Sequence, residues 1–210
     1  MKIYNNEKIM IGITGGVGAG KTEVVNILLN KGYHVIVTDS LTKDIIKSDK
    51  QTQNKIINSF GNESFIDGIY NTKYIASVVF SQPDKLTLLN QIIHPVVITK
   101  LIEIIDQLQS TTLKNNLLFI ESALLYELSL EEGFDYIISV NAPLKIRKQR
   151  LITNRNLTEN QITQILTNQL SQEEKNKYAD FVIENNNSLS ELEKTISNLL
   201  KILTLLPNKN

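Results

Sequence analysis

The apolar residues of the chain fall into short continuous runs, separated by longer stretches in which apolar and polar residues alternate with helical spacing. A strand that is covered on both faces of a parallel sheet carries apolar side chains at successive positions, so each short run predicts a buried strand. Such runs occupy residues 9–13, 33–38, 117–121, 136–140 and 181–183. We expect these runs to form the central sheet of the protein.

The stretches between the runs place apolar residues three and four positions apart, which gathers them on one face of an α-helix. Helices are predicted at residues 23–30, 41–60, 75–80, 84–108, 144–153, 159–170, 172–178 and 189–203. The second is expected to break near Ser48 and Asp49, and Pro95 is expected to kink or divide the fourth, because proline lacks the N–H that a helix needs. Strands that alternate with helices indicate an α/β fold, a doubly wound parallel sheet of about five strands with helices on both sides.

Glycine marks two further boundaries in this pattern. Lys31-Gly32 suits the end of the first helix, because glycine readily adopts the left-handed conformation found there. Asp67-Gly68 predicts a turn within the surface connection at residues 61–71.

The bulk composition is that of an ordinary globular protein. We expect a single domain over residues 1–210, because no repeat, linker or shift in composition marks a boundary. Basic and acidic residues number 22 each, so the charge gives no global reason to expect a nucleic acid or an anionic membrane as partner.

The compartment is suggested by what the composition lacks. The chain has no cysteine, which excludes disulfides and zinc–thiolate sites and suits a reducing compartment. Residues 1–8 are too polar for a signal peptide, and no apolar run approaches the ~18 residues that a membrane span needs. We therefore expect a cytoplasmic protein with no obligate protein partner and a frayed tail at residues 207–210.

The strongest functional signal follows the first predicted strand. The run Gly15-Gly16-Val17-Gly18-Ala19-Gly20-Lys21-Thr22 satisfies the pattern G-x-x-x-x-G-K-[ST] at every fixed position. In such a phosphate loop, backbone N–H groups turn toward a polyphosphate, the lysine reaches the β- and γ-phosphates, and the threonine hydroxyl ligates Mg²⁺. The helix that follows directs its positive N-terminus at the same anion. The alternative, a glycine-rich turn without a ligand, does not require the lysine and threonine in this register.

Two acidic residues close predicted strands. Asp39 ends the second apolar run and Glu121 the third, and ligands of open α/β sheets gather at the carboxyl ends of the strands. Asp39 is our candidate for the carboxylate that receives the proton of an acceptor hydroxyl; an Asp also suits the N-cap of a helix that starts at Ser40, and the two roles are compatible. Glu121 either holds Mg²⁺ through a water molecule or bonds backbone groups across the strand ends, and the sequence leaves both roles open.

All the arginines of the chain lie close together, at Arg147, Arg150 and Arg155, although lysine is used freely elsewhere. Arginine contacts a phosphate through two N–H groups at once, a task that lysine performs poorly. We interpret residues 143–160 as a lid that closes over a bound nucleotide and excludes water, with Arg150 and Arg155 contacting phosphates. A salt-bridged, exposed helix that needs no ligand is the alternative.

Taken in order, these motifs resemble those of the bacterial dephospho-coenzyme A kinases. The resemblance runs from about Ile11 to Leu192 and starts with the phosphate loop. Matching stretches are Asp39, Asp67-Gly68, Val79-Phe80, Ile92-Ile93-His94-Pro95, Leu124-Leu125-Tyr126-Glu127, Arg150-Leu151, Gln169, Glu174-Lys175, Ala179-Asp180 and Val182-Ile183-Glu184-Asn185. The loop alone indicates only a P-loop protein, whereas this ordered series is specific to the family.

The chain also departs from the family pattern. Residues that differ from those usual in the family are Val37 for the first Asp of D-A-D, Lys43 and Thr72 for Arg, Ala123 for Pro, Glu121 for Asp, and Asn154 for a second lid Arg. Arg155 stands one residue after Asn154, about 100° further round a helix. These changes affect substrate contacts more than the class of reaction.

The resemblance implies an ATP-dependent kinase that phosphorylates the ribose 3′-hydroxyl of dephospho-coenzyme A, with ATP and Mg²⁺ as cofactors. It implies catalysis by Lys21, Asp39 and Arg150, and a helical acceptor-binding region at about residues 40–110. Two alternatives stay open. Another P-loop small-molecule or nucleoside monophosphate kinase would share the loop and lid, whereas a GTPase-type switch would need the N-K-x-D motif, which the chain lacks.

Overall fold

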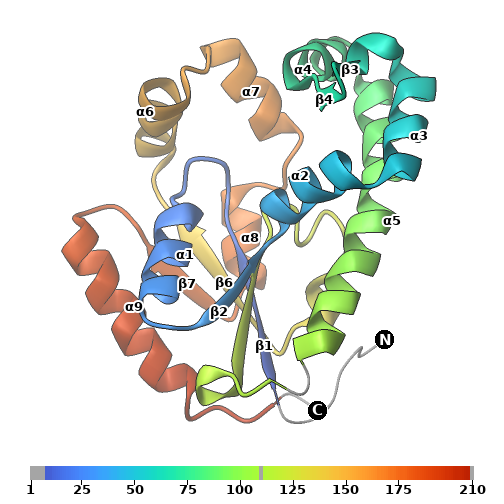
Figure 1. Ribbon diagram of the computed structural model, residues 1–210. Coiled ribbons are helices and arrows are strands. Elements are labelled where there is room, and N and C mark those ends of the chain that lie inside the picture. Colours follow the sequence, from blue (N-terminus) through green and yellow to red (C-terminus); the bar gives the residue numbers. More distant parts are fainter. Residues whose placement is uncertain (1–7, 109–110, 209–210) are drawn as a thin grey trace. The chain divides into compact units, whose positions relative to one another are not determined.

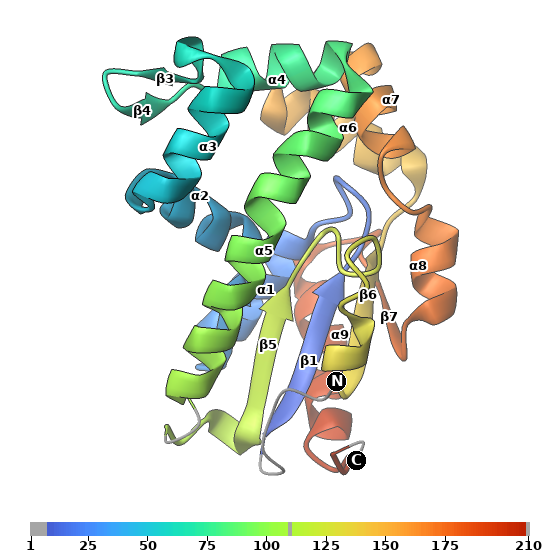
Figure 2. The same ribbon diagram turned by 90° about the vertical axis from the view of Figure 1, so that its right-hand side faces the viewer.

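The chain forms two compact units, and the computed structural model describes residues 8–108 and 111–208 (Figures 1 and 2). The first unit comprises Met1–Val37 and Gln109–Asn210, and the second is the intervening segment Thr38–Leu108. The expectations for the polar start at residues 1–7 and for the end of the tail at residues 209–210 fall outside the described residues.

A parallel sheet of five strands forms the centre of the first unit, as the apolar runs predict. The strand order is β2 (His34–Val37), β5 (Leu117–Glu121), β1 (Ile9–Thr14), β6 (Tyr136–Asn141) and β7 (Phe181–Glu184) (Figure 1). The chain leaves β1 toward β2 on one side and later continues through β6 and β7 on the other. Ligands of doubly wound sheets bind where the strand order reverses in this way, beyond the carboxyl ends of the strands.

Helices α1 (Lys21–Asn30) and α9 (Leu189–Leu203) pack on one face of this sheet (Figure 1). Alternate residues of β1, namely Ile9, Ile11 and Ile13, join them in one buried cluster, because successive strand side chains point to opposite faces. On the other face, Leu125 and Phe134 from the β5–β6 connection lie against Gly12. The sheet is therefore covered on both faces around β1, which fixes the strand that leads into the phosphate loop.

Three more helices of the first unit lie between strands β6 and β7 in the sequence. They are α6 (Leu144–Arg155), α7 (Glu159–Thr167) and α8 (Gln172–Tyr178). Helices α7 and α8 each begin with a capping box, in which Thr158 and Ser171 exchange hydrogen bonds with Gln161 and Glu174. These reciprocal bonds satisfy the first free N–H groups of each helix and set where it starts.

The second unit is mainly helical. Its elements are α2 (Thr38–Ser48), α3 (Lys50–Phe60), η1 (Asn62–Ser64), β3 (Phe65–Ile66), β4 (Ile69–Tyr70), α4 (Thr72–Ser81) and α5 (Pro83–Leu108). The predicted break after Ser48 is confirmed, because Asp49 caps α3 through the N–H groups of Gln51 and Thr52. The predicted turn at Asp67-Gly68 is also confirmed, but the sequence missed the hairpin around it, since strands of two residues carry no periodic signal.

The structure corrects two expectations about this unit. Helix α2 already begins at Thr38, so Asp39 lies in its first turn and neither ends a strand nor caps a helix that starts at Ser40. Helix α5 is not divided at Pro95 and runs unbroken for 26 residues (Figure 2). Its residues Leu89, Ile93 and Val97 recur every four positions and are buried, and this packing outweighs the single helical hydrogen bond that proline removes.

Helix α5 is also apolar over a greater length than the sequence analysis expected. Among the described residues, the segment Asp84–Leu108 alone is long and apolar enough to cross a membrane by length and composition. Core helices of soluble proteins meet the same criterion, and α5 supplies Leu89, Ile93 and Val97 to the core of its own unit. This composition is therefore weak evidence for a membrane span.

The N-cap of α3 leads to a first prediction. Replacing Asp49 by alanine is expected to lower the free energy of unfolding by about 1 kcal/mol at pH 7, because two helix N–H groups lose their acceptor. The hydrogen bond from the Thr52 side chain lowers the pKa of Asp49, so its contribution is present above the unfolded-state pKa, near pH 4, and is lost as the pH falls through the lower folded-state value. Urea unfolding at pH 7 and pH 3 measures both effects.

The matched control is Asp44→Ala, at an exposed position on the neighbouring helix α2. It is expected to change the unfolding free energy by less than about 0.5 kcal/mol at either pH. A loss for Asp49→Ala that stays the same at pH 3 would contradict the capping role of the carboxylate.

Candidate active site

The phosphate loop connects β1 to α1 at the carboxyl edge of the sheet. Its last glycine, Gly20, adopts a left-handed conformation (φ 98°, ψ 29°) directly before α1. Residues with side chains rarely adopt this conformation, which bends the chain so that successive N–H groups can face one centre. Thr22 lies exposed in the first turn of α1, where the positive end of the helix dipole favours an anion.

Lys21 and Glu121, two of the predicted site residues, lie together at this edge. The Lys21 Nζ atom donates to Gly15 O at 2.8 Å and lies 3.9 Å from Glu121 Oε1. Both side chains are largely buried, with 12% and 8% of their surface exposed, so solvent screens their attraction only weakly. Glu121 therefore acts as an electrostatic partner of the loop lysine, a role that the sequence analysis did not consider.

The site offers oxygen atoms rather than a preformed metal cage. Among the described residues, no group of three or more His, Cys, Asp or Glu side chains could hold a metal ion. The Thr22 hydroxyl and the Glu121 carboxylate supply hard oxygen ligands of the kind that Mg²⁺ accepts, and Mg²⁺ usually completes its shell with water and substrate phosphates. The residues present fit Mg²⁺ that arrives with a nucleotide.

Two side chains hold the outer side of the loop at Ala19. Asn185, a buried residue just after β7, donates from Nδ2 to Ala19 O at 2.9 Å. Arg150 of α6 donates to Ala19 O at 3.3 Å and to Asn185 O at 2.9 Å. Because the C=O and N–H of one peptide unit point in opposite directions, fixing Ala19 O on the outside directs the N–H of Gly20 toward the inside of the loop.

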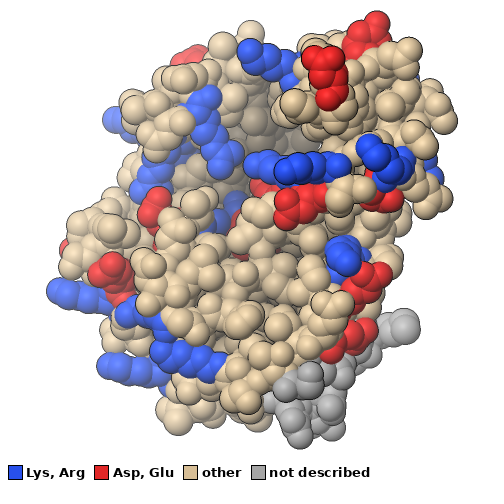
Figure 3. Space-filling model, viewed as in Figure 1, with Lys and Arg blue, Asp and Glu red and all other residues tan. Residues whose placement is uncertain are grey.

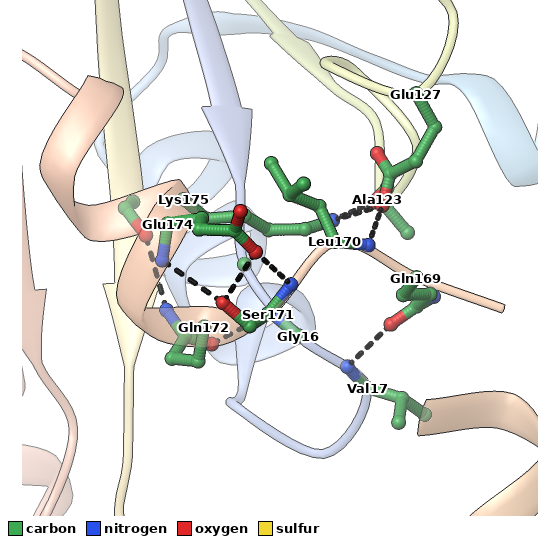
Figure 4. A network of polar contacts seen from close by, with 12 residues as sticks. Gly16, Val17, Ala123, Glu127, Gln169, Leu170, Ser171, Gln172, Glu174 and Lys175 are labelled. Carbon is green, nitrogen blue, oxygen red and sulfur yellow. Dashed lines mark hydrogen bonds and ion pairs between the residues drawn. The ribbon is translucent and has the colours of Figure 1, made fainter. Parts of the chain in front are cut away.

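The start of the loop is held by two glutamines, as Figure 4 shows. Gly16 donates its N–H to Gln172 Oε1 at 2.8 Å, and Val17 donates its N–H to Gln169 Oε1 at 3.2 Å. Gln172 is 5% exposed, and its Nε2 donates in turn to Asn176 Oδ1 at 2.7 Å. The sequence analysis assigned no role to Gln172. The one indication of its contact with Asn176 was that the two residues lie four positions apart on a polar helix.

The fully buried Lys175 extends this network to the segment that follows β5 (Figure 4). Its Nζ atom lies 2.8 Å from Glu127 Oε1 and donates to Ala123 O at 2.6 Å. Glu127 Oε1 also accepts the N–H of Leu170 at 2.8 Å. Helix α8 is thereby fixed to a segment that begins directly after Glu121.

Helix α6 carries a concentration of positive charge, visible at the upper left of Figure 3. Its sequence contains Lys145, Arg147, Lys148, Arg150 and Arg155 and no acidic residue. The structure brings Arg150 to the loop, whereas Arg155 is exposed at the last position of the helix. Asp39 is exposed in the first turn of α2, in the second unit.

Known proteins resemble this chain over most of its length. The sequence model of the dephospho-CoA kinases matches residues 9–191, which include the loop, both glutamines and Asn185. The chain belongs to the dephospho-CoA kinase family. A protein of Fusobacterium nucleatum named dephospho-CoA kinase is 34% identical over 189 residues, which cover 90% of this chain and 95% of that protein.

Further relatives of this kinase support the assignment. A protein of Thermus thermophilus with the same name is 31% identical and covers 93% of this chain and 92% of its own length. A solved Thermus thermophilus structure, 31% identical, superposes with a TM-score of 0.78 over 94% of this chain and 98% of that one. A Campylobacter jejuni dephospho-CoA kinase, 20% identical with a TM-score of 0.67, covers 97% and 98% of the two chains, and this likeness concerns the fold alone.

Proposed function

We propose that this kinase transfers the γ-phosphoryl group of ATP to the ribose 3′-hydroxyl of dephospho-coenzyme A. The observation that carries the proposal is the phosphate loop with Lys21 held beside it, in a chain that matches the family from residue 9 to residue 191. Phosphoryl transfer depends mainly on positioning and on electrostatic stabilisation, and the loop supplies both.

The loop residues would act directly on the nucleotide. The N–H groups from Gly18 to Thr22 and the Lys21 ammonium would hold the β- and γ-phosphates, while Thr22 and Glu121 would orient Mg²⁺ directly or through water. Mg²⁺, when bound, neutralises charge on the phosphate oxygens. Arg150, already at the loop, would stabilise the transferring group, and Arg155 would join it if the lid of residues 143–160 closes.

The acceptor would be activated by Asp39, and the second unit would bind it. Asp39 stands two residues after Val37, and Val37 pairs with Glu121 across β2 and β5. Asp39 therefore comes just after the end of β2, the strand that pairs with β5 at Glu121. This place in the chain supports the proposal that Asp39 receives the hydroxyl proton. We also propose that the enzyme acts in the cytoplasm on small molecules, without a nucleic acid, membrane or obligate protein partner.

The acceptor is tested by ADP release from Mg-ATP with dephospho-coenzyme A, with nucleoside monophosphates, or with no acceptor. Turnover only with dephospho-coenzyme A, together with formation of coenzyme A, is the expected result. Turnover only with a nucleoside monophosphate would support phosphoryl transfer at the loop, but would show that the acceptor is a nucleotide and not dephospho-coenzyme A. Slow hydrolysis without any acceptor effect would contradict the transfer reaction.

The role of Asp39 is tested by Asp39→Asn, which keeps the shape of the side chain and removes its basicity. We expect kcat to fall about a hundredfold or more, with the Kd for ATP changed less than about threefold, because a general base acts only on the chemical step. Asp44→Asn, also exposed on α2, is the matched control and is expected to leave kcat unchanged. Near-normal turnover by Asp39→Asn would remove Asp39 from the mechanism.

A further inference from the structure

Arg147 is a buried arginine beside the phosphate loop that takes no part in the contacts described above. It lies on α6, and only 6% of its surface is exposed. A Cβ atom placed on Gly16 would meet Arg147 Nη1 at 2.0 Å and Cζ at 3.2 Å, so the guanidinium lies directly against the loop backbone. A Cβ atom placed on Gly18 would meet Arg147 O at 2.8 Å, so the backbone of α6 also lies against the loop.

The guanidinium of Arg147 has little to compensate its burial. Its Nε atom is buried without a hydrogen-bond partner. Burial lowers the pKa of Arg147, and the charge of Glu173 on α8 opposes that shift. Arginine nevertheless stays protonated in proteins, so a positive charge with an unused donor at Nε is retained next to the loop.

Such a group is costly, because a buried charge without a partner loses its hydration and gains little in return. A residue that only filled space behind the loop would be more stable as an apolar or neutral side chain. Gln172 and Asn185 bind the loop backbone with neutral amides, so contact with the loop does not itself require a charge. The charge of Arg147 therefore points to a function in the liganded protein.

We propose that Arg147 is a positioning residue of the polyphosphate site, which places a positive charge behind the loop at Gly16 and Gly18. Its field would favour a bound di- or triphosphate, and the anion would supply the compensation that the unliganded protein lacks. This inference rests on the proposed function only in that the loop binds a nucleotide; it does not depend on the acceptor. A charge at this range is expected to change affinity about tenfold at moderate dielectric.

The test compares Arg147→Met with the unsubstituted protein by titration calorimetry with AMP, ADP and ATP, and by the melting temperature of the unliganded protein. We expect the Kd for ATP to rise about tenfold, that for ADP to rise less, and that for AMP to stay within about twofold. The unliganded melting temperature is expected to stay the same or to rise. Lys201→Met, at an exposed lysine on α9, is the control and is expected to change no Kd.

A second variant serves as the test if the Arg147→Met protein is insoluble. Arg147→Gln removes the charge but keeps polar atoms, and the same selective loss for ATP is expected. Equal losses for AMP, ADP and ATP, or no loss for any of them, would overturn the proposal and leave Arg147 a structural residue. Failure of the acceptor assay with intact ATP binding would instead overturn the proposed function and leave this inference standing.

Discussion

Replacing Lys21 by methionine is expected to lower kcat/KM for phosphoryl transfer by at least about a thousandfold. The ammonium lies 2.8 Å from Gly15 O and 3.9 Å from Glu121 Oε1, which places it at the mouth of the loop. Charge that develops on the transferring phosphoryl group would lose the ammonium of the loop lysine, whereas methionine fills a similar volume. Steady-state ADP release with saturating dephospho-coenzyme A measures the effect.

The control for this variant is again Lys201→Met, which removes one exposed ammonium on α9 and is expected to keep full activity. Circular dichroism and the melting temperature establish that the Lys21→Met protein is folded. If this variant kept its kcat/KM within tenfold of the original, the loop would not be the site of transfer.

The largest stability effect is expected at Glu127. Replacing it by alanine leaves Lys175, which is fully buried, with only Ala123 O as a hydrogen-bond partner among the described residues. Removing one member of a buried ion pair costs about 3–5 kcal/mol, because the remaining charge has lost its compensation. Urea unfolding at pH 7 measures this loss.

The two members of this pair are not equivalent, and that asymmetry sharpens the test. Glu127 is 19% exposed and keeps the N–H of Leu170, so Lys175→Met is expected to cost only about 1–2 kcal/mol. In the double variant the buried ammonium is absent, and the loss should be close to that of Lys175→Met alone. Additive losses would show that the two side chains do not act as a pair.

Much of the sheet could be predicted from the sequence, because buried parallel strands leave an uninterrupted apolar run. All five strands are found within one residue of their predicted ends. Helix ends are less exact, and α7 stops at Thr167 instead of residue 170, since an apolar pattern does not show where a helix frays. The β3–β4 hairpin and the continuity of α5 through Pro95 depend on packing within the second unit, which local pattern does not contain.

The candidate site was predictable where its chemistry is local. A contiguous motif identified the loop, Lys21 and Thr22, and family motifs pointed to Gln169, Lys175 and Asn185 without giving them roles. The contact between Gly16 and Gln172 spans 156 positions, and no periodicity or composition indicates which distant amide completes a loop. Asp39 shows the opposite difficulty, because an Asp after an apolar run is compatible with a strand end, a cap or a first helical turn.

The long separation between the phosphate loop and the side chains that hold it has a consequence for synthesis on the ribosome. The loop is made before its partners, because Gln172 and Asn185 follow Gly16 and Ala19 by 156 and 166 residues. At about 5–20 residues per second, roughly 8–30 seconds pass before those partners are made. A nascent chain therefore carries the complete loop motif long before it carries the amides that fix the loop's shape, and its nucleotide site matures only after Gln172 and Asn185 have been made.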